Sequence, residues 1–408
     1  MAISIRESVV TGFSDFWSRK IRSIVTIFGI TLGTMSVIMV MALANGIKKS
    51  TLEWMMERGG LSKITIRRNW EYESPTNQNK YFNLKEIDVI RSLSPDALYF
   101  NPQVRSHGQV KYAQNEYWSS IFGVLPDFRH IEEWDVSEGR FISEFDKDQS
   151  NDVIVIGTQM KEELFGSKKA LGEFVTFKKR RFKVIGIMDF RYMKSQGNIM
   201  QDNALSYLNR RAYIPLTTLI KKVTGQDNIG SLTIKAVDAE SAPALRRHLE
   251  AVVLNMRRNE PVFTIESAQE TAKEMEKNSA QFQIIFFFIS TISLLVGGIV
   301  IANIMLASVQ ERTREIGIRL AVGARKRDIF MQFLVQTVLV TTIGGIVGVV
   351  TGLSLLDVVS GYLGFDLIAG IEMIITAVAV SAGVGFIAGI VPAVIASKLN
   401  PVEALRYE

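Results

Sequence analysis

The chain has 408 residues, a net charge of +6 and no cysteine, and 47% of its residues are hydrophobic. The lack of cysteine excludes disulfides and thiolate metal sites, so any folded domain must be held by packing alone. A basic soluble protein would suggest nucleic acid as a partner, but here Lys and Arg cluster beside long apolar runs. This arrangement favours membrane topology, and we expect no nucleic-acid binding.

The beginning of the chain, residues 1–22, predicts a short cytoplasmic amphipathic helix. Apolar Ile5, Val9 and Phe13 are mixed there with charged residues such as Arg6. A segment of this kind lies on the membrane surface rather than across the bilayer.

Four apolar runs are long enough to cross a bilayer, whose core needs about 20 helical residues. We assign transmembrane helices to residues 23–45, 281–309, 329–357 and 373–397. The interiors of these runs hold no Lys, Arg, Asp or Glu. A cleavable signal peptide is the competing interpretation of the first run. That run is too long for one, begins too far into the chain and is followed by no small-residue cleavage site.

Between the first and second spans, residues 46–280 are predicted to form a large mixed α/β extracytoplasmic domain. A βαβ-type base comprises residues 46–109 and 216–280, and an inserted β-rich subdomain comprises residues 110–215. Polar residues alternate with Ile64 and Ile66 at the period of a strand. Asn83 and Glu86 then have the spacing of a capping box that begins a helix. A second strand and helix, with Pro243 in the first helical turn, repeat this unit near the end of the domain.

The inserted subdomain is rich in predicted strands. Residues 153–156 have the composition of a buried strand, and residues 174–177 and 182–187 flank a basic turn. This pattern predicts a hairpin with a basic tip at residues 178–181. Such a tip is most often a solvated turn, and contact with a partner or substrate is the alternative.

Between the second and third spans, residues 310–328 have the pattern of a charged helix. The pairs Glu311–Arg314, Arg312–Glu315 and Glu315–Arg319 have the spacings of three and four that bring charges together along a helix. Ile316 and Leu320 share another stripe. Gly323 is suited to end this helix, and Asp328 lies where a negative charge favours the start of the next span. The alternative is a solvated loop that only sets topology, and the residues alone leave both interpretations open.

Basic residues beside the spans predict the orientation of the chain. Lys and Arg precede the first span, fill residues 310–328 and follow the fourth span, whereas the loop of residues 358–372 has none. Both termini, including the tail of residues 398–408, are therefore expected in the cytoplasm, with residues 46–280 outside. We therefore expect a multi-pass protein of the cell inner (cytoplasmic) membrane.

Small residues recur at helix-packing spacing in three of the spans. They are Gly29, Gly33, Gly344, Gly348, Gly352, Gly385 and Gly389. This spacing lets helices approach closely in lipid, either within one bundle or across a dimer. The alternative is that glycine is simply common in membrane helices.

The motifs of the common enzyme classes are missing from the sequence. It has no phosphate-binding G-x-x-x-x-G-K-[ST] loop, no G-x-S-x-G elbow and no H-E-x-x-H pair, and its three histidines lack metal-ligand spacing. We therefore expect no catalytic residue, cofactor site or metal site in this chain. The lack of ionisable residues inside the spans also argues against an ion-coupled transporter.

Three stretches of the chain resemble one family of permeases. The sequence ERTREIGIRLAVGA, which begins at Glu311, is similar to the signature after the second span in the MacB-type and FtsX-like ABC transporter permease family. The ending NPVEALRYE from Asn400 and the first span KIRSIVTIFGITLG from Lys20 resemble the same family. The layout of one plus three spans around an outward domain also matches, so the resemblance covers nearly the whole chain.

The resemblance implies a permease of the mechanotransmission type, acting as a homodimer or with a paralogue. Two copies of a cytoplasmic ABC ATPase would bind ATP and Mg²⁺ and move the outward domains. The residues assigned to ATPase coupling are Glu311, Arg312, Arg314, Glu315, Ile316, Gly317, Arg319, Leu320 and Gly323. We expect the ATPase to cover Ile316 and Leu320, and substrate to be handled outside the membrane by residues 46–280, with residues 110–215 reaching a partner.

Two departures from the family pattern are visible. Gln336 stands where many members carry a glutamate, so no role is transferred to it. Macrolide exporters fuse the ATPase to the permease, whereas we expect a separate ATPase chain here, because residue 1 lies just before the first span.

The resemblance leaves several tasks open. Export of a drug, peptide or similar substrate, through a periplasmic adaptor and an outer-membrane channel, is the first expectation. The alternatives are release of lipoproteins to a carrier, FtsX-like control of a cell-wall hydrolase, and a membrane-anchored binding or signalling protein without an ATPase.

Overall fold

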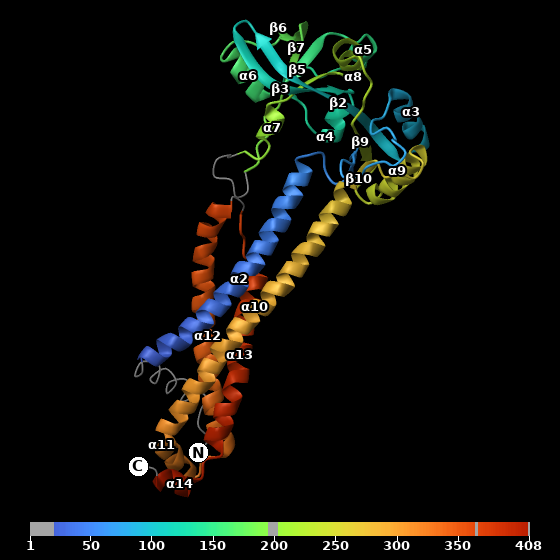
Figure 1. Cartoon of the computed structure of the whole chain (residues 1–408). Coiled ribbons are helices and arrows are strands. Elements are labelled where there is room, and N and C mark those ends of the chain that lie inside the picture. Colours follow the sequence, from blue (N-terminus) through green and yellow to red (C-terminus); the bar gives the residue numbers. More distant parts are fainter. Residues whose placement is uncertain (1–19, 195–202, 364–365, 407–408) are drawn as a thin grey trace. The chain divides into compact units, whose positions relative to one another are not determined.

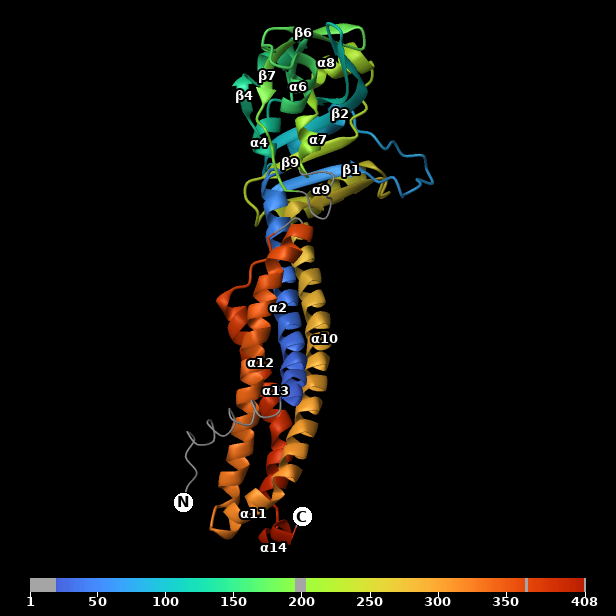
Figure 2. The same ribbon diagram turned by 90° about the vertical axis from the view of Figure 1, so that its left-hand side faces the viewer.

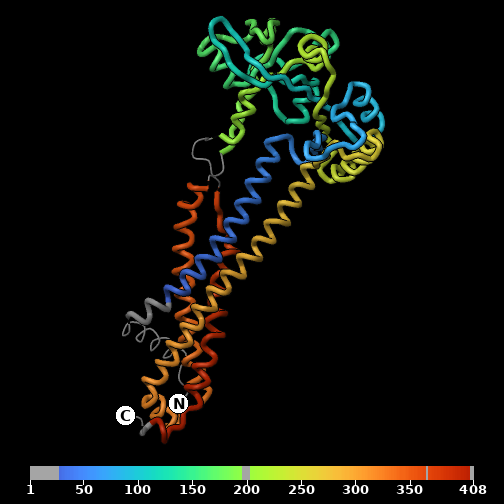
Figure 3. The backbone as a smooth tube through the Cα atoms, in the orientation of Figure 1, coloured from blue at the N-terminus to red at the C-terminus, as the bar shows by residue number. Residues whose placement is uncertain are grey.

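The computed structural model describes residues 20–194, 203–363 and 366–406. The first 19 residues of the expected amphipathic helix lie outside these ranges. The chain divides into two units, which we call the helical unit (Met1–Lys48 and Asn278–Glu408) and the sheet unit (Lys49–Lys277). These limits lie beside the boundaries at 45/46 and 280/281 expected from the sequence. Figures 1 and 3 follow the chain through both units.

The helical unit is built from long apolar helices. They are α2 (Lys20–Met56), α10 (Ala268–Glu311), α12 (Lys326–Leu363) and α13 (Ile371–Ser397). Within the described residues, these are the four helices long and apolar enough to cross a membrane. Two short helices, α11 (Thr313–Ala321) and α14 (Pro401–Arg406), complete this unit.

Glycine lets α2 lie close to its neighbours in the helical unit. A Cβ added at Gly29 would lie 3.6 Å from Gly297 Cα of α10, and one at Gly33 would lie 2.7 Å from the Leu294 side chain. On the α12 side, a Cβ at Gly348 would lie 2.8 Å from Thr34 Cβ of α2. Gly344 and Gly352, on the same stripe of α12, also face α2.

A second glycine stripe joins α13 to α12. A Cβ at Gly385 would lie 1.9 Å from Thr341 Oγ1, and one at Gly389 would lie 3.0 Å from Thr337 Cβ. Ser381 Oγ donates a hydrogen bond of 2.7 Å to Thr341 O between the same helices. The predicted small-residue stripes therefore pack helices within one chain, so they no longer argue for a dimer.

The base of the sheet unit consists of two interleaved strand–helix–strand units. The first is β1 (Lys63–Arg68), α3 (Leu84–Leu93) and β2 (Ala97–Tyr112); the second is β9 (Ser231–Ala236), α9 (Ala242–Met256) and β10 (Phe263–Ser267). The sheet order is β10-β1-β9-β2, so each unit places a strand of the other between its own two strands. Figure 2 shows α9 beside β1 and β9. The predicted α/β base is therefore present.

The remaining strands of the sheet unit form the inserted region between β2 and β9. They are β3 (Asn115–Val124), β4 (Val136–Gly139), β5 (Val153–Ile156), β6 (Phe174–Phe177), β7 (Arg180–Met188) and β8 (Ala212–Pro215). The short helices are α4 (Phe128–Glu132), α5 (Glu144–Asp148), α6 (Thr158–Phe165), α7 (Ser206–Asn209), α8 (Leu216–Thr218) and the π-helix η1 (Leu219–Thr224). The predicted fold class, four apolar helices with a mixed α/β domain, is confirmed.

The inserted region and the base share one strand and one core. β2 pairs with β9 from Ala97 to Gln103 and with β3 from Val104 to Tyr112. The hydrophobic cluster that contains Ile64 of the base also contains residues of the inserted region. The insertion therefore begins within a strand rather than at a linker.

Two local predictions for the sheet unit are confirmed. Asn83 and Glu86 form a capping box at the start of α3, with each side chain bonded to the backbone N–H of the other. Residues Lys178 and Lys179 join β6 to β7 in a two-residue turn with φ of +46° and +66°. Positive φ at both positions matches the right-handed twist of a hairpin.

Candidate functional site

The candidate coupling segment is a separate short helix, α11, that follows a break in the chain. α10 ends at Glu311, and Arg312 has φ −106° and ψ 11°, outside the helical range. The Thr313 hydroxyl at the start of α11 donates hydrogen bonds to Val309 O (3.1 Å) and Gln310 O (2.8 Å). These bonds use carbonyls at the end of α10, which lack partners within their own helix.

The end of α11 follows the predicted glycine signal. Gly323 has φ +101°, and the N–H of Ala324 donates to Arg319 O at 3.0 Å. Asp328 accepts a hydrogen bond from the N–H of Arg325 at 3.3 Å, in the first turn of α12. Both features depend on residues that are neighbours in the chain, so they could be predicted from the sequence.

One face of α11 is buried by the chain itself. Ile316 is 3% exposed and belongs to a hydrophobic cluster with Ile329 and Phe333 of α12 and Ala396 of α13. Leu320 is half-buried against the same cluster. The expectation that the ATPase covers Ile316 is therefore wrong, because that side chain is already removed from water.

The C-terminal helix α14 holds α11 in place. A Cβ added at Gly317 would lie 2.6 Å from the Cβ of Ala404, which is 2% exposed. Only glycine allows this approach. The loop and the C-terminal sequence each resembled the family separately, and the structure joins them into one small assembly.

Arg319 links α11 to the third predicted span. Its Nη1 donates to Oε1 of Gln332 at 2.9 Å, and its Nη2 donates to Oε1 of Glu315 at 2.5 Å. Gln332 is 5% exposed. The predicted Glu315–Arg319 pair is therefore confirmed, while the pairs Glu311–Arg314 and Arg312–Glu315 stay predictions.

The outer face of α11 carries two apolar residues that sequence reasoning missed. Ile318 is 48% exposed and Val322, at the end of the helix, is 85% exposed. They lie four residues apart on one stripe, beside the exposed Arg314 and Glu315. Their spacing was visible in the sequence. Two apolar stripes were present, however, and only the tertiary structure shows which one is buried.

Family models match most of the chain. A model described as the MacB-like periplasmic core domain matches residues 23–252. A model described as the FtsX-like permease C-terminal matches residues 287–401, which include α11.

Curated relatives carry the name macrolide export ATP-binding/permease protein MacB. That of Bdellovibrio bacteriovorus is 31% identical over 412 residues, covering 98% of this chain and 62% of the relative. That of Neisseria gonorrhoeae is 32% identical over 392 residues, covering 96% and 59%. That of Campylobacter jejuni is 31% identical over 404 residues, covering 97% and 60%. The chain thus spans about three fifths of the length of these relatives.

Two solved structures are similar to part of the chain. The periplasmic region of MacB from Actinobacillus actinomycetemcomitans is 23% identical with a TM-score of 0.46, covering 55% of this chain and 97% of that one. The extracellular domain of the ABC-type transporter YknZ from Gram-positive bacteria is 14% identical with a TM-score of 0.42, covering 50% and 100%.

Proposed function

Because this chain belongs to the MacB-like, FtsX-like family of ABC transporter permeases, we propose that it couples ATP hydrolysis by an ABC ATPase subunit to movement of the sheet unit. In this scheme α11 is the helix that the ATPase grips in the cytoplasm, and the sheet unit works outside the membrane. The observation that carries the proposal is the exposed apolar stripe of Ile318 and Val322. The opposite face of the same helix is packed against the rest of the chain.

The energetics favour an apolar grip on α11. To switch a two-state permease from 1:99 to 99:1, ATP binding must favour one state by about 5.5 kcal/mol. Exposed ion pairs contribute only about 0.2–1 kcal/mol each, so Arg314 and Glu315 fix register rather than affinity. Full burial of an exposed aliphatic side chain contributes roughly 1.5–3 kcal/mol, and about half of that remains for Ile318, which is already half-buried. Together Ile318 and Val322 supply about 2–4 kcal/mol of the required difference.

The orientation rests on charge. The α11 end of the bundle carries Arg314, Arg325, Lys326 and Arg327, whereas the loop of residues 358–372 has no Lys or Arg. Basic residues are retained on the cytoplasmic side. This charge distribution supports a topology in which α11 and the chain ends lie inside and the sheet unit lies outside.

Substrate handling outside the membrane is supported by the interior of the spans. Among the described residues, the buried polar side chains of the spans are Thr34, Ser290, Gln332, Gln336, Thr337, Thr341, Ser381 and Ser397. None of these is ionisable, whereas ionisable residues within spans typically mark substrate and ion pathways. The names of the relatives favour export of a drug, peptide or similar substrate. Release of lipoproteins and control of a cell-wall hydrolase are the alternatives.

The test is binding of the cognate ABC ATPase to the detergent-solubilised full chain. Ile318→Asp and Val322→Asp should each weaken binding by at least about tenfold, since about 1.4 kcal/mol corresponds to a factor of ten. Val237→Asp adds the same charge at an exposed apolar residue of the sheet unit and should leave binding unchanged. Membrane insertion of every variant is checked in parallel. Unchanged binding by both α11 variants would mean that the ATPase does not contact this stripe and that the charges of α11 only set the membrane topology.

The family plan also implies two permease chains in one complex with two ATPase subunits. Native mass spectrometry of the purified complex should show two copies of this chain, or one copy with a paralogue. A complex with a single permease chain and two ATPases contradicts the dimer.

A further inference from the structure

The base sheet of the sheet unit has one apolar and one strongly basic face. Along β1, Ile64 and Ile66 point into the core, and alternation places Lys63, Thr65 and Arg67 on the opposite face. The neighbouring strands follow the same rule, since Thr65 pairs with Thr233 of β9. The polar face of the base is therefore a surface that the core does not use.

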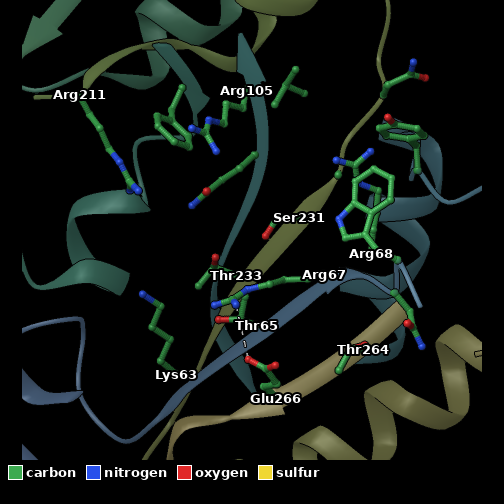
Figure 4. Close-up of a pocket in the computed structure, with 18 of the residues that line it drawn as sticks. Lys63, Thr65, Arg67, Arg68, Arg105, Arg211, Ser231, Thr233, Thr264 and Glu266 are labelled. Carbon is green, nitrogen blue, oxygen red and sulfur yellow. Dashed lines mark ion pairs between the residues drawn. The ribbon is translucent and has the colours of Figure 1, made fainter. Parts of the chain in front are cut away.

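This polar face forms the floor of a cavity of about 1040 Å³. Arg105 and Phe122, on β2 and β3, and Arg211 before β8 line its opposite side, as the close-up in Figure 4 shows for the two arginines. The cavity thus lies where the base and the inserted region meet. Its volume accommodates a small molecule or a headgroup rather than a single ion.

Six cations and two carboxylates line the cavity. The cations are Arg58, Lys63, Arg67, Arg68, Arg105 and Arg211, and the carboxylates are Glu71 and Glu266. Glu132, outside the lining, bonds Lys63 at 2.5 Å, and Glu266 lies 3.7 Å from Arg67. Two of the six cations therefore have carboxylate partners.

The other four cations have no carboxylate within 4.0 Å among the described residues, and each lies over an aromatic ring instead. Arg58 lies 4.3 Å from the ring of Trp54, and Arg68 lies 4.0 Å from Trp70 and 4.4 Å from Tyr81. Arg105 and Arg211 share the ring of Phe122 at 5.5 and 4.6 Å. Ring contacts hold the guanidinium groups but leave their N–H donors available.

The pair Arg105 and Arg211 is held together against repulsion. Burial lowers the pKa of Arg105, and the charge of Arg211 lowers it further. The Arg105 Nη2 donates to the Ser120 hydroxyl at 2.9 Å, which leaves its charge uncompensated. An anion between the two arginines would neutralise this cost.

We propose that this cavity binds a polyanionic ligand that carries two or more phosphate groups. The guanidinium fork matches phosphate oxygens with two parallel hydrogen bonds, and four such groups exceed what a single carboxylate can neutralise. Hydroxyls of Thr65, Ser231 and Thr233 on the floor supply further donors. A phosphorylated lipid headgroup and a soluble phosphate compound share this chemistry.

The proposal stands apart from the transport function, because binding to the purified chain is measured at equilibrium without ATPase. Calorimetry of the detergent-solubilised full chain uses inorganic pyrophosphate as one probe and a bisphosphorylated lipid in mixed micelles as the other. Binding of pyrophosphate assigns a soluble ligand, and binding of the lipid alone assigns a headgroup.

The double variant Arg105→Gln/Arg211→Gln should weaken binding by roughly a hundredfold, about tenfold for each charged hydrogen-bond donor removed. Arg181→Gln is the matched control, because Arg181 also stacks on a phenylalanine ring, at 4.7 Å from Phe174, but does not line the cavity. This control should bind as the unaltered chain does.

Ser231→Asp provides a second variant that keeps every arginine in place. It adds a carboxylate at the cavity floor and should also weaken binding at least tenfold. Thermal unfolding without ligand confirms that each variant is folded. Failure of both probes to bind the unaltered chain, or undiminished binding in the cavity variants, overturns the proposal.

Discussion

The two units of the chain bury polar groups in different ways. Among the described residues of the helical unit, the buried polar side chains are hydroxyls and amides, and close contact depends on glycine, as where Ser381 bonds the backbone of Thr341 beside Gly385. In the sheet unit, a charged side chain is buried as well: Arg257 bonds the half-buried Glu86 with distances of 2.6 and 3.0 Å. Apolar surroundings exclude unpaired charge, so the helical unit is sensitive to an added charge and to shape, whereas the sheet unit is sensitive to the loss of an ion-pair partner.

The largest effect should come from placing a charge in the helical unit. Ile316→Asp buries a carboxylate among apolar residues of α12 and α13, which should destabilise the α11 assembly by several kcal/mol. Limited proteolysis at the basic loop after Gly323 reports this loss. Ile318→Asp on the exposed face is the control and should be cut no faster than the unaltered chain. Equal resistance of Ile316→Asp would mean that α11 is not held as described.

Breaking an ion pair should have the next largest effect, in the sheet unit. Arg257 is 4% exposed, and its guanidinium also donates to Asn79 O and Tyr81 O, each at 3.0 Å. Arg257→Met leaves Glu86 without its partner and should cost about 3–5 kcal/mol. Denaturant unfolding followed by tryptophan fluorescence measures this loss of stability, because four of the five tryptophans lie in the sheet unit. Arg247→Met, at an exposed position of α9, should change stability by less than about 0.5 kcal/mol.

A single methyl group tests the shape sensitivity of the helical unit. Gly385→Ala forces a Cβ against the β-branched Thr341 and should destabilise the α12–α13 contact by about 1–3 kcal/mol. Gly383→Ala on the same helix meets nothing within 4 Å and is the matched control. Unfolding in mixed detergent micelles compares the two. Similar stability of both alanine variants would contradict the close helix contact.

The smallest effect should be the response to acid, and it should be confined to the sheet unit. Burial raises the pKa of Glu86, but hydrogen bonds from Arg257 and the Asn83 N–H outweigh it and hold that pKa below its usual value. Burial likewise raises the pKa of Asp146, and bonds from Arg140, Ser143 and Asn151 lower it well below normal.

Groups with a depressed folded pKa stabilise the fold above their unfolded pKa of about 4, and this stability is lost as pH falls further. The fluorescence-detected unfolding midpoint should therefore fall between pH 5 and pH 2. The Glu86→Gln variant should be less stable at pH 7 and should lose less as the pH falls. An equal acid loss in this variant would exclude Glu86 as a source.

The sequence was a good guide where the signal is local. The Asn83 cap, the Lys178–Lys179 turn and the end of α11 at Gly323 each depend on a few neighbouring residues. The sequence did not predict burial correctly where contact with a residue distant in the chain determines it. Both Ile316 and Ile318 suit a helix face, and Ala404 and Ile329 determine which one is buried. The basic cavity was missed for the same reason, since Arg105 and Arg211 come together only when β2 and β8 join one sheet.

The length of β2 has a consequence for protein engineering. Domains are usually exchanged at exposed linkers with few crossing contacts. Here, a cut at residue 110 would split a strand of 16 residues and divide a common core, so deletion of residues 110–215 would unfold the base as well. A chimera with a relative should therefore carry β2 whole, with β9 as the second junction. The recipient would then inherit Arg105 and Arg211 together, while the floor of the basic cavity would come from its own β1 and β9.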